Sequence, residues 1–180
     1  DELPAGRRRI STEWFFEDER LDVFERVRGE LKAGRQAFIV YPVIEDNPKL
    51  ELASARSMFK EFRDKIFREF RVGLIHGKLK RTEQEAVMRD FRSGGIDILV
   101  ATSVLEVGID VPNASVMVIE HADRFGLSQL HQMRGRIGRG PYPSFCYLLA
   151  DEATQEAGVR LKAMVEYLDG FKIAEEDLRL

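Results

Sequence analysis

The sequence predicts an α/β domain in which a parallel sheet is covered by helices on both faces. Several short segments are apolar throughout, without the alternation of a strand that faces water, which is typical of strands buried on both sides. Segments with apolar residues at three- and four-residue spacing separate them, as in helical crossovers between parallel strands. The 180 residues, 44% of them hydrophobic, suffice for one such domain and contain no internal repeat.

Glycine, proline and helix-capping residues mark where these segments begin and end, and so fix the order of strands and helices. Gly34 stops the first helix, and Pro42 ends the strand that follows it. Thr82 opens a later helix with Glu85 in the capping-box position, and Gly94 stops that helix. We expect strands at 12–16, 37–41, 72–75, 96–101, 116–119 and 145–149, and helices at 21–31, 52–66, 82–91, 128–136 and 152–168. In open sheets of this kind ligands bind at the carboxyl ends of the strands, so we expect the functional residues there.

The domain organisation predicted from this pattern is a single unit over residues 1–180. Residues 1–33 form an N-terminal segment with the first helix, and residues 34–168 form the core lobe. Residues 169–180 are expected to begin a C-terminal extension that is cut short, because the chain starts without Met and stops in a charged stretch.

Composition excludes several classes of protein. The net charge is −3 and the pI about 5.8, so nucleic acid would be bound through a few local contacts and not through bulk positive charge. Cys146 is the single cysteine, lies in an apolar run, and is expected to be a buried core thiol. The three histidines have no metal-ligand spacing, and we expect no metal site. There is no apolar run long enough for a membrane span and no secretory signal, so cytoplasm is the expected compartment.

The most informative stretch is 129–140, with the sequence QLHQMRGRIGRG. Its three glycines would cost a helix about 1 kcal/mol each relative to Ala, so close approach of backbone or ligand is the expected reason for them. Arg136 and Arg139 are three residues apart and would share one face of a helix, where two guanidinium groups favour an anion between them. The alternative is a solvated basic helix face.

A second stretch follows the predicted strand that ends at Ala101. Thr102 and Ser103 would place hydroxyl groups and free backbone N–H groups at a helix start, which is suited to phosphate. Gly108 permits a turn that presents Asp110, whose carboxylate suits sugar hydroxyls. The alternatives are plain N-capping for the hydroxyl residues and a local Asx turn for Asp110.

A third stretch joins the predicted strand 72–75 to the helix after it. It carries Lys78 and Lys80, which indicate contact with a phosphate backbone, whereas His76 is expected to be structural. The sequence has no G-x-x-x-x-G-K-[ST] phosphate loop and no acidic pair after an apolar strand to hold Mg²⁺. The arginines are therefore predicted to act on a nucleotide held elsewhere.

These stretches resemble conserved motifs of superfamily-two helicases. Residues 37–42 resemble motif IV, Thr102 to Asp110 resemble motif V, and Q-x-x-G-R-x-G-R from Gln132 to Arg139 resembles motif VI. Within that superfamily the sequence is most similar to the RecG family of branched-DNA helicases. The segments that carry this similarity are YPVIE at 41–45, HGKLK at 76–80, 106–112, ADRFGLSQLHQ at 122–132 and AEEDL at 174–178.

The resemblance implies a three-layer RecA-like domain that is the second motor lobe of an ATP-dependent DNA helicase or translocase. Arg136 and Arg139 would be arginine fingers that reach the γ-phosphate of ATP. Gln132, Gly108 and Asp110 would lie near the nucleotide, and Thr102 and Ser103 would contact DNA.

The same resemblance implies partners and alternatives. ATP and Mg²⁺ would be held mainly by the first motor lobe of the same polypeptide, and the DNA would be branched with duplex arms, as in fork and Holliday junction processing during recombination and repair. The chain alone would then be inactive. A lobe of a transcription-repair coupling translocase and a non-catalytic nucleic-acid-binding lobe stay open as alternatives. A stand-alone α/β enzyme is disfavoured because no nucleophile–base pair is found.

Overall fold

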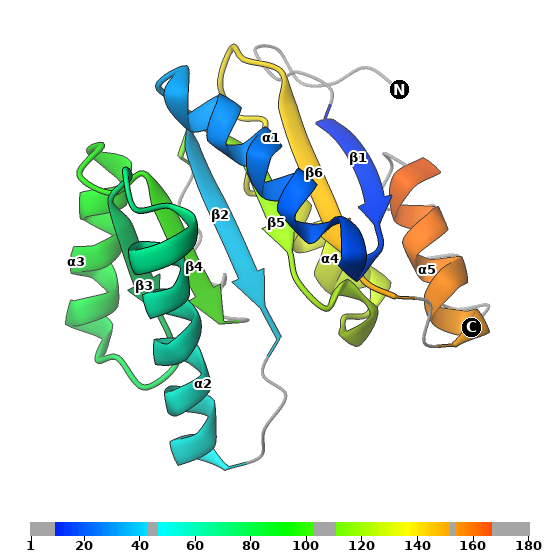
Figure 1. Ribbon diagram of the computed structural model, residues 1–180, viewed down its shortest axis with the longest axis horizontal. Helices are drawn as coiled ribbons and strands as arrows, with labels where there is room; N and C mark the ends of the chain where they lie inside the picture. Colours follow the sequence, from blue (N-terminus) through cyan, green and yellow to red (C-terminus); the bar gives the residue numbers. More distant parts are fainter. Residues whose placement is uncertain (1–9, 43–46, 103–110, 152–153, 167–180) are drawn as a thin grey trace.

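The computed structural model describes residues 10–42, 47–102, 111–151 and 154–166. Within them six strands form one sheet with all neighbours parallel, in the order β1-β6-β5-β2-β4-β3 (Figure 1). The strands are β1 (Ile10–Phe15), β2 (Gln36–Tyr41), β3 (Val72–Ile75), β4 (Ile98–Thr102), β5 (Ala114–Ile119) and β6 (Ser144–Leu149). The helices are α1 (Arg20–Lys32), α2 (Pro48–Glu61), α3 (Arg81–Arg92), α4 (Leu127–Arg134) and α5 (Gln155–Glu166), with short turns η1 (Glu17–Glu19), η2 (Phe62–Ile66) and η3 (Ala122–Arg124).

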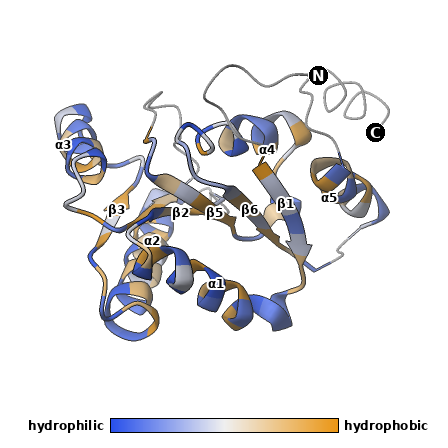
Figure 2. Ribbon diagram, turned by 90° about the horizontal axis from the view of Figure 1, so that it is seen from above, coloured by the Kyte–Doolittle hydropathy of each residue, from blue (hydrophilic) through white to orange (hydrophobic). Residues whose placement is uncertain are grey.

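Helices cover both faces of the sheet, as the sequence predicted. Viewed from above, α1 and α2 lie on one side, and α3, α4 and α5 lie on the other (Figure 2). Each side has its own hydrophobic core: Phe24 and Phe62 pack on the α1–α2 side, and Phe91 and Leu130 on the opposite side. Every residue of β2, β4 and β5 is buried, which explains why these strands are apolar on both faces.

Glycines end two helices where the sequence predicted. Gly34 follows α1 and Gly94 follows α3, and both have φ of +91°, a backbone conformation that other residues adopt only with strain. Neither has an atom within 4 Å of where a Cβ would lie, so the backbone angle and not space requires glycine. Cys146 is fully buried as expected, and burial raises the pKa of its thiol to about 12.

Several helix boundaries differ from the prediction, the largest shift at a helix start being that of α2, which begins at Pro48 and not at residue 52. The helix expected to open at Thr82 begins at Arg81, and Glu83, not Glu85, accepts a hydrogen bond from the N–H of Lys80 at 3.0 Å. Glu85 instead forms an ion pair with Arg81 one turn away. The helix expected to reach residue 136 ends at Arg134, so Arg136 and Arg139 do not share a helix face. Within the described residues, no helix is both long and apolar enough to cross a bilayer.

Candidate functional site

The segment that carries the predicted arginine fingers lies at the amino ends of the strands. This segment connects α4 to β6. Tyr142 packs against Arg35, the residue before β2, and the guanidinium carbon of Arg35 lies 3.3 Å from the centroid of the Tyr142 ring. Gly140 lies against Pro112, just before β5: a Cβ on Gly140 would stand 2.2 Å from the Pro112 carbonyl oxygen. The expectation that these residues sit at the carboxyl ends is therefore wrong. A segment that runs from a crossover helix into the next parallel strand must reach the strand's amino end.

The glycines of this segment have separate structural reasons. Gly138 has φ of +78°, and Gly140 is needed for the close approach to Pro112, which confirms the expected role of close backbone packing. Ile137, the residue before Gly138, is fully buried. The backbone that carries Arg136 and Arg139 is thus fixed by one inward side chain and by two positions that only glycine suits.

The three arginines of the segment take different positions. Arg134 is buried and donates from Nη1 to Thr12 Oγ1 at 3.2 Å and to the Met164 carbonyl at 2.7 Å, so it joins α4 to β1 and α5. Arg136 is half-buried, and Arg139 is exposed with Nε donating to the Gly135 carbonyl at 3.1 Å.

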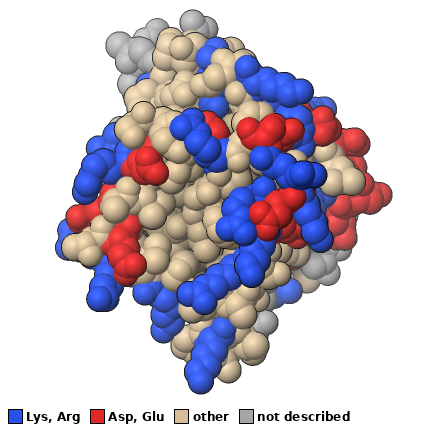
Figure 3. Space-filling model, turned by 60° about the vertical axis from the view of Figure 1, so that its left-hand side comes forward, with Lys and Arg blue, Asp and Glu red and all other residues tan. Residues whose placement is uncertain are grey.

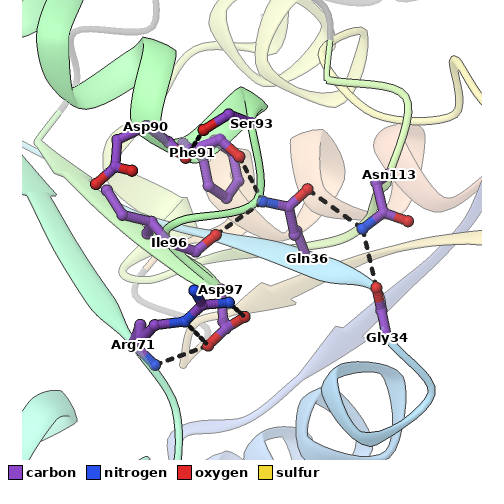
Figure 4. Close-up of polar contacts among 9 residues, drawn as sticks. All are labelled: Gly34, Gln36, Arg71, Asp90, Phe91, Ser93, Ile96, Asp97 and Asn113. Carbon is purple, nitrogen blue, oxygen red and sulfur yellow. Dashed lines mark hydrogen bonds and ion pairs between the residues drawn. The ribbon is translucent and has the colours of Figure 1, made fainter.

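A polar network lies at the same end of the sheet, which is formed by the amino ends of the strands and is called the amino edge below (Figure 4). Gln36, which is 3% exposed at the start of β2, donates from Nε2 to the carbonyls of Phe91 at 2.5 Å and Ile96 at 2.7 Å. Asn113, just before β5, donates from Nδ2 to the Gly34 carbonyl at 2.9 Å and to Gln36 Oε1 at 3.3 Å. The ends of α1 and α3 are thereby tied to the strand starts. Sequence reasoning missed Gln36, although a lone amide opening an apolar strand is a usable signal.

The residues predicted to contact DNA lie at the opposite end of the sheet, which is formed by the carboxyl ends of the strands and is called the carboxyl edge below. β3 and β4 pair with Ile75 beside Ala101, so His76 and Thr102 follow side by side at the carboxyl ends. Lys78 and Lys80 are exposed in the loop after β3, as expected. His76 is 8% exposed and its Nδ1 accepts the N–H of Lys78 at 3.1 Å, which is the structural role predicted for it. Ser103, Gly108 and Asp110, like Glu106, lie outside the described residues.

Thr102 opens onto a cavity of about 160 Å³ between α2 and the strand ends. It is 5% exposed, and its Oγ1 has no hydrogen-bond partner among the described residues, so its hydroxyl can still donate or accept a bond. The cavity is lined by Tyr41, Pro42, Glu51, Ser54, Ala55, Met58, Thr102 and His121.

A buried charged network forms one wall of this cavity. Glu120, 1% exposed at the end of β5, accepts from Arg20 Nε and Nη2 at 2.9 Å each and from the hydroxyl of Tyr41. Burial disfavours the charged form of Arg20, but the hydrogen bond and charge of Glu120 outweigh it and raise the pKa of the guanidinium. Burial and then the Glu120 charge raise the pKa of Tyr41, which keeps its hydroxyl protonated. This network was missed because its members are up to 100 residues apart.

Related sequences match the chain along its whole length. The ATP-dependent DNA helicase RecG of Thermotoga maritima is 49% identical over 179 residues, and that of Bacillus subtilis is 50% identical over 181 residues. These matches cover 99% and 100% of this chain but 23% and 26% of the relatives, so the chain spans about a quarter of their length.

Solved structures agree with the sequence matches. A structure of RecG bound to a three-way DNA junction has a TM-score of 0.84 at 47% identity, covering 99% of this chain and 23% of that chain. Domain 2 of the DEAD-box helicase Mss116p, bound to an RNA duplex, has a TM-score of 0.64 at 16% identity over 94% of this chain and 68% of that one, a likeness that shows the fold alone.

These findings confirm the predicted RecA-like fold and the resemblance to RecG. The family described as the helicase conserved C-terminal domain matches residues 19–141, about two thirds of the sequence. The chain belongs to this family of helicase C-terminal domains.

Proposed function

We propose that this chain is the second motor lobe of an ATP-dependent DNA helicase or translocase that acts on branched DNA in recombination and repair, in the cytoplasm. The observation that carries the proposal is the division of the predicted residues between two edges of one sheet. Arg136 and Arg139 lie at the amino edge, and Lys78, Lys80 and Thr102 lie at the carboxyl edge. Separate edges suit a motor lobe that touches ATP on one side and DNA on the other.

At the amino edge, Arg136 and Arg139 contact the γ-phosphate of ATP held by the first motor lobe. ATP supplies the free energy, and its Mg²⁺ is held with it by the first lobe. Gln132, Gly108 and Asp110 are assigned to the same nucleotide contact, and the close approach of Gly140, at the end of motif VI, to Pro112 supports this assignment. The arginines gain bonds to phosphate only when the lobes close, so binding favours the closed state and hydrolysis reopens it.

At the carboxyl edge, Lys78 and Lys80 contact phosphates of the DNA backbone, and Thr102 and Ser103 offer hydroxyl and N–H donors to them. The identity with RecG over the whole chain favours this proposal over the transcription-repair coupling alternative. A structure of RecG bound to a three-way DNA junction supports branched DNA as the substrate.

The test is DNA-stimulated ATP hydrolysis by the full-length protein with Arg139→Ala. Loss of an arginine finger typically costs about 10³-fold or more in turnover, so we expect near-complete loss with nucleotide binding largely kept. Lys162→Gln, a charge removed from an exposed site on α5, is the control and should hydrolyse ATP like the wild type. Wild-type turnover in Arg139→Ala would remove this residue from the mechanism. It would also favour a non-catalytic binding lobe.

A further inference from the structure

The positive charge of the chain is concentrated in one part of it. Residues 48–92, which form α2, β3 and α3, contain twelve Lys and Arg against seven Asp and Glu, a net charge of +5. The remaining residues carry −8, because the whole chain carries −3. Figure 3 turns the β3 side of the molecule forward and shows Lys and Arg side chains over much of this face, with Asp and Glu between them and along its right-hand edge. The net positive charge of this acidic chain therefore lies in residues 48–92.

Within this region, three basic residues lie along one face of α2. Lys49, Arg56 and Lys60 are spaced seven and four residues apart, so they lie on one side of the helix, and all three are exposed. With a rise of 1.5 Å per residue the stripe is about 16 Å long. We define Lys49, Arg56 and Lys60 as the α2 stripe. The two acidic residues of α2 face elsewhere: Glu51 lines the cavity and Glu61 bonds Arg20.

Among the described residues, the charges of the α2 stripe have no partner carboxylate. By contrast, Arg63, Arg71 and Arg81 nearby each form an ion pair. Like charges four residues apart on a helix are unfavourable, so Arg56 and Lys60 do not stabilise α2 itself. The pKa of Asp64 is lowered first by its hydrogen bond from Arg63 and also by Lys60 and Arg68, which shows that the local field is positive.

The α2 stripe is continuous with the proposed DNA contacts at the carboxyl edge. α2 packs along β3, and the loop after β3 carries Lys78 and Lys80. His76, the residue after β3, accepts the N–H of Lys78. Burial, and then the charge of Arg56, lowers the pKa of His76, while the charges of Glu51 and Glu83 act in the opposite direction. The helix that carries the stripe and the loop that carries Lys78 and Lys80 are thus neighbours in the fold.

We propose that the α2 stripe binds the phosphate backbone of duplex DNA, extending the contact made at Lys78 and Lys80 along the outer face of α2. This proposal rests on the proposed function and adds three residues to it. A row of exposed cations about 16 Å long, with no ion pair to a described carboxylate, matches a charged backbone with regularly spaced phosphates, and it makes no demand on base sequence. The stripe should therefore contribute affinity and salt dependence without sequence preference.

The test compares three variants of the full-length protein on a fluorescent three-way junction with duplex arms. The first is Lys49→Gln/Arg56→Gln/Lys60→Gln, and the second is Lys78→Gln/Lys80→Gln. The third is a control of equal charge change, Arg89→Gln/Arg92→Gln/Lys162→Gln, in which all three residues are exposed on α3 and α5, on the opposite face of the sheet from α2. The dissociation constant is measured over a series of KCl concentrations, and thermal unfolding checks that each variant is folded.

Each phosphate contact contributes about 0.9 to the slope of log affinity against log salt concentration. The stripe variant should lose about 2 to 3 from this slope and bind about tenfold more weakly at moderate salt, while the control stays within about twofold of wild type. The full-length protein with Lys49→Arg and Lys60→Arg should keep the wild-type slope of log affinity against log salt concentration, because both substitutions preserve the positive charge.

The outcomes separate this inference from the proposed function. If the stripe variant has the same salt slope as the control, the inference is overturned. The same result is expected if the stripe binds an acidic protein and not DNA. If in that case Lys78→Gln/Lys80→Gln still loses slope, the proposed DNA edge survives alone. If neither variant loses slope, both proposals fail.

Discussion

The two edges of the sheet are stabilised by different chemistry. At the amino edge, neutral amides of Gln36 and Asn113 bond to backbone carbonyls, and Gly140 packs directly on the backbone of Pro112. At the carboxyl edge, the buried carboxylate of Glu120 is held by Arg20 and Tyr41 beside a cavity. The amino edge thus combines amide-to-carbonyl bonds and close backbone packing with a partly exposed ion pair between Arg71 and Asp97, whereas the carboxyl edge contains a buried carboxylate.

This difference matches what each edge is proposed to do. Arginine fingers act on a phosphate whose position is set by another lobe, so their own backbone must be placed to within a fraction of an ångström. Close packing and short bonds to carbonyls provide that. At the carboxyl edge the Thr102 hydroxyl has no partner among the described residues and Lys78 and Lys80 are exposed, which suits contacts that form and break as DNA moves.

The largest effect is expected from removing the charge at the centre of the carboxyl edge. Glu120→Ala leaves Arg20, whose side chain is 22% exposed, without its main partner. Breaking a buried pair from one side typically costs 3–5 kcal/mol, and we expect about 3 kcal/mol here because Tyr41 and Glu61 still contact Arg20. Urea unfolding of the chain measures this loss.

The matched control for Glu120 is Glu13→Ala. Glu13 pairs with Arg26, and both side chains are nearly half exposed, so this change should cost less than about 1 kcal/mol. Equal losses in the two variants would mean that burial does not distinguish the Arg20 network from an ordinary surface pair.

A second, smaller loss is expected at the amino edge from Gly140→Ala. The added Cβ meets the Pro112 carbonyl, and forcing an extra methyl group into a packed site costs about 1–3 kcal/mol. Because the segment must shift, full-length protein should also lose ATP hydrolysis even where it is fully folded. Gly29→Ala in the exposed part of α1 meets no atom within 4 Å and should be neutral or stabilising. Unchanged ATP hydrolysis in Gly140→Ala would show that the Pro112 contact does not position the arginines.

The sequence predicted the sheet well because its strands are buried. The strand at 72–75 has the predicted bounds, and the others differ by two residues or fewer, since apolar runs between Gly and Pro leave little choice. The capping box was misplaced because Glu83 and Glu85 are both candidates, and only the contact between Glu83 and Lys80 decides between them. Local pattern alone cannot make that choice.

The position of the arginines was wrong for a reason that the sequence contained. The predicted order of strand, helix and strand across residues 116–149 already requires the segment after the helix to lie at the amino edge. The general preference of ligands for carboxyl ends obscured this. The pairing of Arg20 with Glu120 is different, because no local pattern links residues 100 positions apart.

The smallest effect concerns pH at the carboxyl edge. Burial, and then the charge of Arg56, lowers the pKa of His76 below its usual value near 6.5. Below that value the unfolded chain binds the proton more readily than the folded chain, so the contribution of His76 to stability is full above pH 6.5 and is lost as pH falls. His76→Asn should therefore flatten the decline in melting temperature between neutral and mildly acidic pH. Arg56→Gln should flatten it partly, because burial remains. A decline as steep in His76→Asn as in the wild type would assign the acid sensitivity of this edge to other groups.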